Sequence, residues 1–432
     1  VLKKIIIMTK NIMVGYAGLD HLGLHSAVAT ASKGISVVGY DENFYKIFQL
    51  KKGNFSYKEP GLVKLYNKNK KKINFTSEIK KLSKCKIVYI SLDVKTDALG
   101  KSNLEPIKKL IKNVIKILNN KTILVILSQV PPGFTRKVKW NKKKLFYQVE
   151  TLIFGEAINR ALHPERLIIG CLNTVCLNNS HYDNFLKKYN CPILPMKYES
   201  AEFTKISINI FLASSVTTTN TLSELCEKIG ADWSEITPAL QMDRRIGRYA
   251  YIKPGLGISG GNLERDIKNV FNFSIKNKTN NKIIKSIILN SRYRKRWIYN
   301  MFLEKVLKNK KNPKVCILGL TYKENTSSLK NSPSISLIKK LKRYKVSVYD
   351  PGVKNKKINY PVHQSNNIFE ATSKADVLLI LTPWKIFSLI EPKTLKRVMK
   401  GKVIIDPYRV LNEEKFKKYG FSYFTLGKKT NL

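Results

Sequence analysis

Short apolar runs alternate with helical patterns along the first third of the chain. Residues 12–16 and 35–40 have the length and composition of buried strands, and residues 26–33 between them favour a helix. Two further apolar runs, at residues 86–92 and 122–128, have a second helical pattern between them. Strands that alternate with helices are typical of a parallel sheet with crossover helices.

The middle of the chain has a different pattern. The stretch from residue 200 to Gly230 contains no proline, and no glycine before its end, which indicates one long helix. Apolar residues recur in it at helical spacing: Phe203, Ile206, Ile210 and Phe211. A second helical pattern covers residues 263–271.

A basic linker at residues 305–314 precedes a return to strands and helices. Strands are predicted at residues 315–320, 346–349, 375–381 and 403–406, and a helix at 334–344. We therefore predict an α/β protein with two Rossmann-like parallel-sheet domains, joined by a central helical region with a long helix. The predicted domains cover residues 9–199, 200–304 and 305–432.

The hydrophobic content and the net charge of the chain indicate which kinds of binding partner to expect. Hydrophobic residues make up 43% of the 432, which excludes wholesale disorder. The chain carries 79 Lys and Arg against 30 Asp and Glu, a net charge of +49 that invites a nucleic-acid partner. The basic residues are spread along the whole length, so a solvated basic surface is the interpretation we favour.

The cysteines indicate the redox state of the protein's compartment, and the apolar runs indicate whether a segment could span a membrane. The six cysteines form no CxxC pair and the five histidines do not cluster with them, so we expect no metal site and no disulfide framework. A reducing, cytoplasmic compartment is the expectation. No apolar run reaches the roughly 18 residues of a membrane span, and residues 1–7 are too short for a signal peptide, with Met8 a candidate start.

A glycine turn near the N-terminus has the pattern of a dinucleotide-binding site. Gly18 and Gly23 lie between the first predicted strand and helix, and Asp41 follows the second strand, roughly 20 residues later. The middle glycine of the pattern is replaced by Asp20, whose carboxylate would crowd and repel a pyrophosphate. A nucleotide-free α/β turn is the alternative.

Further motifs follow over nearly the whole chain. They lie at residues 59–61, 128–133, 164–166, 205–209, 243–247, 255–266, 319–323 and 332–333. In this order the series resembles the UDP-glucose/GDP-mannose dehydrogenase family, from about Asn11 to Arg409. The resemblance implies an NAD-binding N-terminal domain, a central dimerisation region, and a C-terminal domain that binds a UDP- or GDP-linked sugar. It also implies a homodimer that supplies polysaccharide precursors.

The family oxidises a sugar C6 alcohol to an aldehyde, captures it on a cysteine, and oxidises and hydrolyses the thioester to a uronic acid, consuming two NAD. Lys205 and Asn209 match the pair that stabilises developing negative charge, and their spacing places both on one helix face. Asp266 matches an acid that assists proton transfer, and Glu165 matches a general base in hydrolysis of the thioester. The alternatives are a surface lysine beside an ordinary asparagine, a first-turn helix acid, and a loop acid paired with a nearby base.

The resemblance also assigns binding residues. It implies cofactor contacts at Gly18, Gly23, Asp41, Gln129 and Pro131. It implies substrate contacts at Arg245, Gly257, Gly260, Lys323 and Arg409, with Arg245 reaching across a dimer and Arg409 within one residue of the matching position. A solvated charge is the alternative for each basic residue, and a plain flexible loop for the glycines.

The departures from the family fall on its catalytic and cofactor positions. Asn262 stands where the family has its nucleophilic cysteine, and an amide cannot form a thiohemiacetal or thioester. Other departures are Asp20, Asp93-Val94-Lys95, Gln129, Arg265 and Ser327-Ser328. We therefore predict a single hydride transfer that ends at an aldehyde or ketone.

Two alternatives remain open. Asp20 and Asn262 also favour a degraded relative that binds a nucleotide-sugar without turnover. A nucleic-acid-binding protein would need clustered basic residues, and the sequence shows no clear clustering, so we expect no nucleic-acid partner.

Overall fold

The computed structural model describes residues 12–57, 59–96, 102–178, 180–353 and 358–429. It divides into two compact units, residues 1–208 and 209–432, and the division falls within the long helix α9 (Tyr198–Ile229). The central helices and the C-terminal sheet therefore belong to one unit. The three predicted domain boundaries stay a prediction, and the candidate start at Met8 lies outside the described residues.

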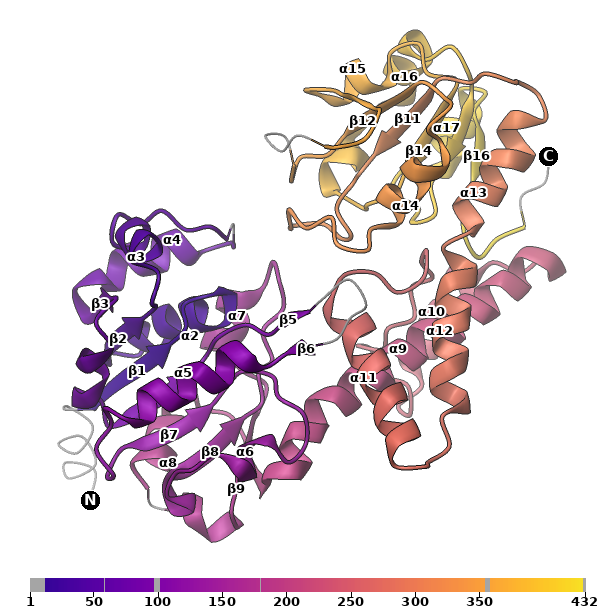
Figure 1. Ribbon diagram of the computed structural model, residues 1–432. Helices are drawn as coiled ribbons and strands as arrows, with labels where there is room; N and C mark the ends of the chain where they lie inside the picture. Colours follow the sequence, from indigo (N-terminus) through magenta and orange to yellow (C-terminus); the bar gives the residue numbers. More distant parts are fainter. Residues whose placement is uncertain (1–11, 58, 97–101, 179, 354–357, 430–432) are drawn as a thin grey trace. The chain divides into compact units, whose positions relative to one another are not determined.

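Unit 1 is built on a sheet of eight strands (Figure 1). Its order is β10 (Ile193–Lys197), β9 (Leu167–Cys171), β8 (Leu145–Gln148), β7 (Ile123–Ile126), β4 (Ile87–Ile90), β1 (Met13–Ala17), β2 (Ser36–Tyr40) and β3 (Ile73–Thr76). All pairs are parallel, as predicted, except β8 with β9, which is antiparallel. A separate antiparallel pair joins β5 (Lys95–Thr96) to β6 (Ser102–Asn103).

Helices cover this sheet because its central strands are buried and apolar on both faces. Alternate residues of β1 enter different apolar clusters: Val14 and Tyr16 enter one, and Ala17 enters the other. Strands buried on both faces are expected in a parallel sheet. The helices are α2 (His21–Ser32), α3 (Phe44–Lys51), α4 (Leu62–Asn69), α5 (Glu105–Ile115), α6 (Phe134–Lys137), α7 (Ala157–Leu162) and α8 (His181–Leu186).

Unit 2 contains a six-stranded sheet in which every pair is parallel. Its order is β13 (His363–Gln364), β12 (Val346–Tyr349), β11 (Val315–Leu318), β14 (Val377–Ile380), β15 (Val403–Ile405) and β16 (Ser422–Phe424). The sheet helices are α14 (Pro333–Lys340), α15 (Ile368–Thr372), α16 (Pro392–Val398) and α17 (Glu413–Lys418). This confirms the second parallel-sheet domain.

The helical part of unit 2 follows α9. It consists of α10 (Trp233–Met242), α11 (Asn262–Lys276), α12 (Lys282–Arg294) and α13 (Trp297–Phe302). A π-helical turn, Leu303–Leu307, continues α13 into the segment predicted as a linker, because Val306 is buried in the core of the C-terminal domain. Among the described residues, no helix combines the length and apolar character needed to cross a bilayer.

The same turn geometry occurs at the first strand of each sheet. Gly18 and Gly319 have positive φ angles of 97° and 92°, a conformation that favours glycine. In each sheet an aspartate, Asp41 or Asp350, directly follows the neighbouring strand. It accepts a hydrogen bond from the backbone N–H after that glycine, at 3.0 and 2.6 Å. Both ends of the chain thus carry one strand–turn–strand arrangement, as the repeated strand–helix pattern suggested.

Candidate active site

The β1–α2 turn can be made only with its two glycines. A Cβ at Gly23 would lie 1.9 Å from the carbonyl oxygen of Gly18, and a Cβ at Gly18 would lie 2.7 Å from the backbone nitrogen of Leu92. The chain therefore comes close to itself at the start of α2. This is the close strand–helix packing that a dinucleotide-binding turn requires.

Asp41 is held firmly at the end of β2. One carboxylate oxygen, Oδ2, accepts the Leu19 N–H at 3.0 Å, and the other accepts the Asn43 N–H at 3.1 Å. Nζ of Lys46, on α3, lies 2.7 Å from Oδ2. Asp41 thus occupies the predicted position of a ribose acceptor, already fixed by the backbone.

Asp20 forms an ion pair with Lys46, a contact that was not predicted from the sequence. Nζ of Lys46 lies 2.6 Å from Asp20 Oδ1, so this lysine bridges Asp20 and Asp41. Burial opposes the charge of Lys46, but hydrogen bonds to the two carboxylates raise its pKa overall. Together, Lys46, Asp20 and Asp41 carry one net negative charge. Asp41 alone would carry the same charge. The repulsion expected from Asp20 is therefore largely offset.

A second carboxylate lies at the same helix end. Asp93 Oδ1 accepts the Leu22 N–H, in the first turn of α2, at 3.3 Å. Burial, followed by the charge of Asp20, raises the pKa of Asp93 to about 6. The glycine turn and Asp41 fit a dinucleotide, whereas ionised Asp93 adds charge where a pyrophosphate would be attracted.

The predicted cofactor residues Gln129 and Pro131 lie in the loop between β7 and α6. Gln129 is half-buried and Pro131 is exposed. Buried Glu202, on α9, accepts the backbone N–H groups of Gly133 and Thr135 at 2.5 and 2.7 Å. The end of this loop is therefore tied to the helix that carries Lys205.

Lys205 faces a carboxylate that the sequence analysis did not select. Its Nζ lies 3.3 Å from Glu150 Oε2, and both side chains are 16% exposed. Glu150 follows β8 at the carboxyl end of that strand. An acid directly after a buried strand was the available signal, because ligands bind at that edge of a parallel sheet.

Glu165 lies elsewhere. Its side chain is 62% exposed and pairs with Arg166 at 2.9 Å and with Arg160 at 3.4 Å. The structure thus gives it the surroundings of the alternative interpretation, a loop acid paired with nearby bases, and places Glu150 rather than Glu165 beside Lys205.

In unit 2 the structure brings Asn209 and Asp266 together. The amide nitrogen of Asn209 lies 2.5 Å from Asp266 Oδ2, and Arg265 Nε donates to Oδ1 at 3.0 Å. Asp266 is 0% exposed. Arg265, predicted to be a departure from the family, pairs with this buried acid.

Asn262 is the exposed first residue of α11, and its spacing from Asp266 places the two on one helix face. Among the cysteines whose side chains the structure describes, burial raises the pKa of Cys85 to about 12, and it also raises those of Cys191, Cys226 and Cys316. None of these thiols has the lowered pKa of a nucleophile.

The predicted substrate glycines belong to a packed loop. Gly257 and Gly260 have φ angles of 75° and 84°. A Cβ at Gly257 would lie 2.4 Å from the carbonyl oxygen of Ser291, and one at Gly260 would lie 2.8 Å from the ring of Tyr322. Both glycines are therefore closely packed against neighbouring groups, and their role in substrate binding stays a prediction.

The predicted substrate cations differ in their surroundings. Arg245 is 89% exposed and pairs with Asp243 at 2.6 Å, whereas Lys323 is half-buried in the turn after β11. Arg409 donates to both oxygens of Asp232, at 2.7 and 3.2 Å, and to Ser234 Oγ at 2.6 Å. Its guanidinium therefore holds the start of α10 to the C-terminal domain.

Comparison with known proteins gives one family. The NAD binding domain of the UDP-glucose/GDP-mannose dehydrogenase family matches residues 12–185, its central domain matches 199–292, and its UDP binding domain matches 316–413. A UDP-glucose 6-dehydrogenase of Rickettsia bellii is 27% identical, covering 96% of this chain and 99% of its own. UDP-glucose 6-dehydrogenase TuaD of Bacillus subtilis is also 27% identical, covering 96% and 93%.

Solved structures show the same fold. A UDP-glucose dehydrogenase from Pyrobaculum islandicum has a TM-score of 0.85 at 24% identity, covering 96% of this chain and 98% of its own. A UDP-D-ManNAc dehydrogenase from Pyrococcus horikoshii has a TM-score of 0.83 at 20% identity, covering 97% and 100%. With all three domains matched in order, the chain belongs to the UDP-glucose/GDP-mannose dehydrogenase family of NAD-dependent nucleotide-sugar dehydrogenases.

Proposed function

We propose that this dehydrogenase oxidises the C6 alcohol of a UDP-linked hexose by one hydride transfer and releases a carbonyl product. The choice of a UDP-linked sugar as substrate is supported by two relatives that are described as UDP-glucose 6-dehydrogenases. The observation that carries the single transfer is Asn262, which stands one helical turn before the buried acid Asp266 and offers no thiol. The product would enter polysaccharide precursor synthesis.

NAD, when bound, supplies the acceptor for the hydride that leaves the sugar carbon. In our proposal Gly18 and Gly23 let its pyrophosphate approach the start of α2, and Asp41 accepts a ribose hydroxyl. Gln129 and Pro131 contribute from the β7–α6 loop. Lys46 reduces the negative charge of this end of the site.

Lys205 is proposed to stabilise the negative charge that develops on the alcohol oxygen as its proton leaves. Glu150, 3.3 Å from Lys205, is the proposed acceptor of that proton. The carboxylate is mostly buried, so it is shielded from bulk water in a way that the exposed Glu165 is not.

In unit 2 the Asp266 carboxylate is proposed to orient the Asn209 amide, while Arg265 balances the buried charge. Gly257, Gly260, Lys323 and, from a second copy of the chain, Arg245 are proposed to bind the nucleotide-sugar. Arg409 is assigned to the fold, because Asp232 and Ser234 already take its donors.

A binding protein without turnover is the second candidate. Asp93 favours it, because its carboxylate already accepts an N–H at the start of α2. The test is a panel of UDP- and GDP-linked sugars, assayed for NADH formation, with the binding of each sugar and of NAD measured by calorimetry. NADH formation with one sugar supports the dehydrogenase, and sugar binding without any NADH supports the second candidate.

A further inference from the structure

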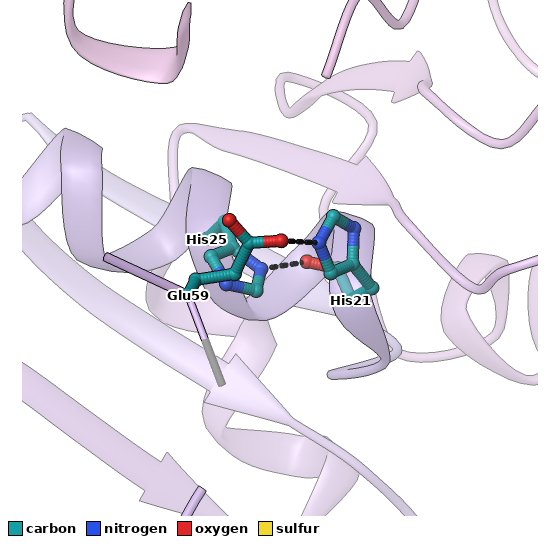
Figure 2. A group of neighbouring side chains, drawn as sticks. All are labelled: His21, His25 and Glu59. Carbon is teal, nitrogen blue, oxygen red and sulfur yellow. Dashed lines mark hydrogen bonds and ion pairs between the residues drawn. The ribbon is translucent and has the colours of Figure 1, made fainter. Parts of the chain in front are cut away.

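Two histidines and a glutamate form a buried cluster at the start of α2. His21 and His25 are four residues apart, so their side chains share one face of the helix, and Glu59 comes from the segment before α4. One ring nitrogen from each histidine and one oxygen of Glu59 lie within 4.8 Å of one another. Figure 2 shows the three side chains grouped around the first turn of the helix.

The bond from His25 to a carbonyl, and the backbone bonds to Glu59, match the supporting hydrogen bonds of a metal site. His21 Nε2 lies 2.9 Å from Glu59 Oε1, and His25 Nδ1 donates to the backbone carbonyl of His21. The Glu59 carboxylate also accepts the Gly155 N–H at 2.9 Å and the Ala157 N–H at 3.3 Å. Metal-binding histidines typically donate their second ring N–H to a carbonyl, and ligating carboxylates are themselves hydrogen-bonded.

One nitrogen of the cluster has no partner. His25 is 0% exposed, and within the described part of the chain its Nε2 makes no hydrogen bond. Because Nδ1 donates to a carbonyl, Nε2 carries a lone pair. A buried acceptor without a donor costs free energy, and a bound cation would remove that cost.

We propose that His21, His25 and Glu59 bind one Zn²⁺ ion, which ties α2 to the segment that carries Glu59. Two imidazoles and a carboxylate are donors that zinc prefers, and ligand atoms in a tetrahedral zinc site lie about 3.3 Å apart. His21 Nε2 and Glu59 Oε1 are already 2.9 Å apart. The ion would therefore replace the proton between them with little movement of these two side chains. This site goes beyond the dehydrogenase function and does not depend on it. It was not expected from the sequence, where Glu59 is 34 residues or more from either histidine.

Zinc binding to the full-length, untagged, metal-free protein tests the proposal. Calorimetric titration with zinc chloride, without NAD, is expected to show one ion per chain, and zinc is expected to raise the melting temperature. His25→Gln and Glu59→Gln are expected to weaken binding at least tenfold. His363→Gln is the matched control, because His363 pairs with Glu370 at 3.2 Å on the surface, and it is expected to bind zinc as the unaltered protein does.

Absence of zinc binding, or unchanged affinity in His25→Gln, overturns the proposal. X-ray absorption of the cobalt-substituted, unaltered protein gives an answer even where the variants fail to fold. A shell of nitrogen and oxygen with two imidazoles supports the site, and sulfur ligands or fewer than two imidazoles contradict it.

Discussion

Nζ of Lys46 lies 2.6 Å from Asp20 Oδ1, and the same nitrogen lies 2.7 Å from Asp41 Oδ2. This ion pair places the Lys46 cation, from α3, beside Asp20. Asp20 is the residue that differs most from the glycine pattern of a dinucleotide-binding turn. Lys46 offsets the negative charge of Asp20, and this pairing can be tested by removing each partner.

Lys46→Met is expected to weaken NAD binding about tenfold, or about 1.4 kcal/mol, because Asp20 and Asp41 then face the pyrophosphate without a counter-charge. In an Asp20→Gly background the same change is expected to have a smaller effect. Calorimetry over this double-mutant cycle measures the coupling. Lys51→Met, on the exposed end of α3, is the control, and equal losses in both backgrounds would contradict the pairing.

NAD affinity is expected to rise as the pH falls from 7 to 5. The pKa of Asp93 is about 6, so the carboxylate loses its charge at the start of α2 over this range. Asp93→Asn is expected to bind NAD more tightly at pH 7 and to lose most of this pH dependence. An unchanged pH profile in Asp93→Asn would exclude Asp93 as its source.

Asp93→Asn is also expected to raise the melting temperature at pH 7 without NAD. The folded-state pKa of Asp93 lies above the unfolded value near 4, so ionisation costs stability, increasingly as the pH rises from about 4 to 6. Asparagine keeps an acceptor for the Leu22 N–H and carries no charge. A melting curve at pH 4 is the control, since the side chain at position 93 is uncharged there in both folded proteins.

Arg409→Ala is expected to destabilise unit 2 by about 1–2 kcal/mol at pH 7, because Asp232 loses a bidentate partner. Burial opposes ionisation of Asp232, but bonds from Arg409 and Ser234 lower its pKa to about 2. The stabilisation is therefore present above about pH 4 and is lost as the pH falls from 4 towards 2.

Chemical denaturation at pH 7 and pH 2.5 checks this pH dependence. The proposed structural role also predicts little change in the substrate KM of the folded variant. A large rise in KM with unchanged stability would return Arg409 to the substrate site.

Asn262→Cys is expected to raise the NADH formed per sugar above one, because the thiol restores a group that can capture an aldehyde. Asn262→Ser is the matched control for size, and it is expected to behave as the unaltered enzyme does. End-point NADH absorbance, with product mass, measures the change. An identical yield from Asn262→Cys would show that the missing thiol alone does not set the limit.

The sequence predicted the architecture because strand and helix signals are local. The long helix α9 and both parallel sheets follow from apolar periodicity, and the antiparallel β8–β9 pair does not. Whether β9 runs parallel or antiparallel to β8 depends on the path of the connecting segment. The local pattern of apolar residues does not specify that path. The start of α2 at His21 was also missed, since its glycine-containing first turn has low helix propensity.

The site was predicted less completely, because its partners come from distant segments. Asn209 and Asp266 meet across 57 residues, and resemblance found both. Lys46 could not be paired with Asp20 from spacing, and Glu150 could not be paired with Lys205, because only the folded sheet edge brings each pair together.

The most direct test of the central claim is the number of NADH molecules formed for each nucleotide-sugar consumed at completion, with the product identified by mass spectrometry. One NADH per sugar with an aldehyde product is the predicted result. Two NADH per sugar with a uronic acid product would contradict the account, because the thioester route would then run without a cysteine at position 262.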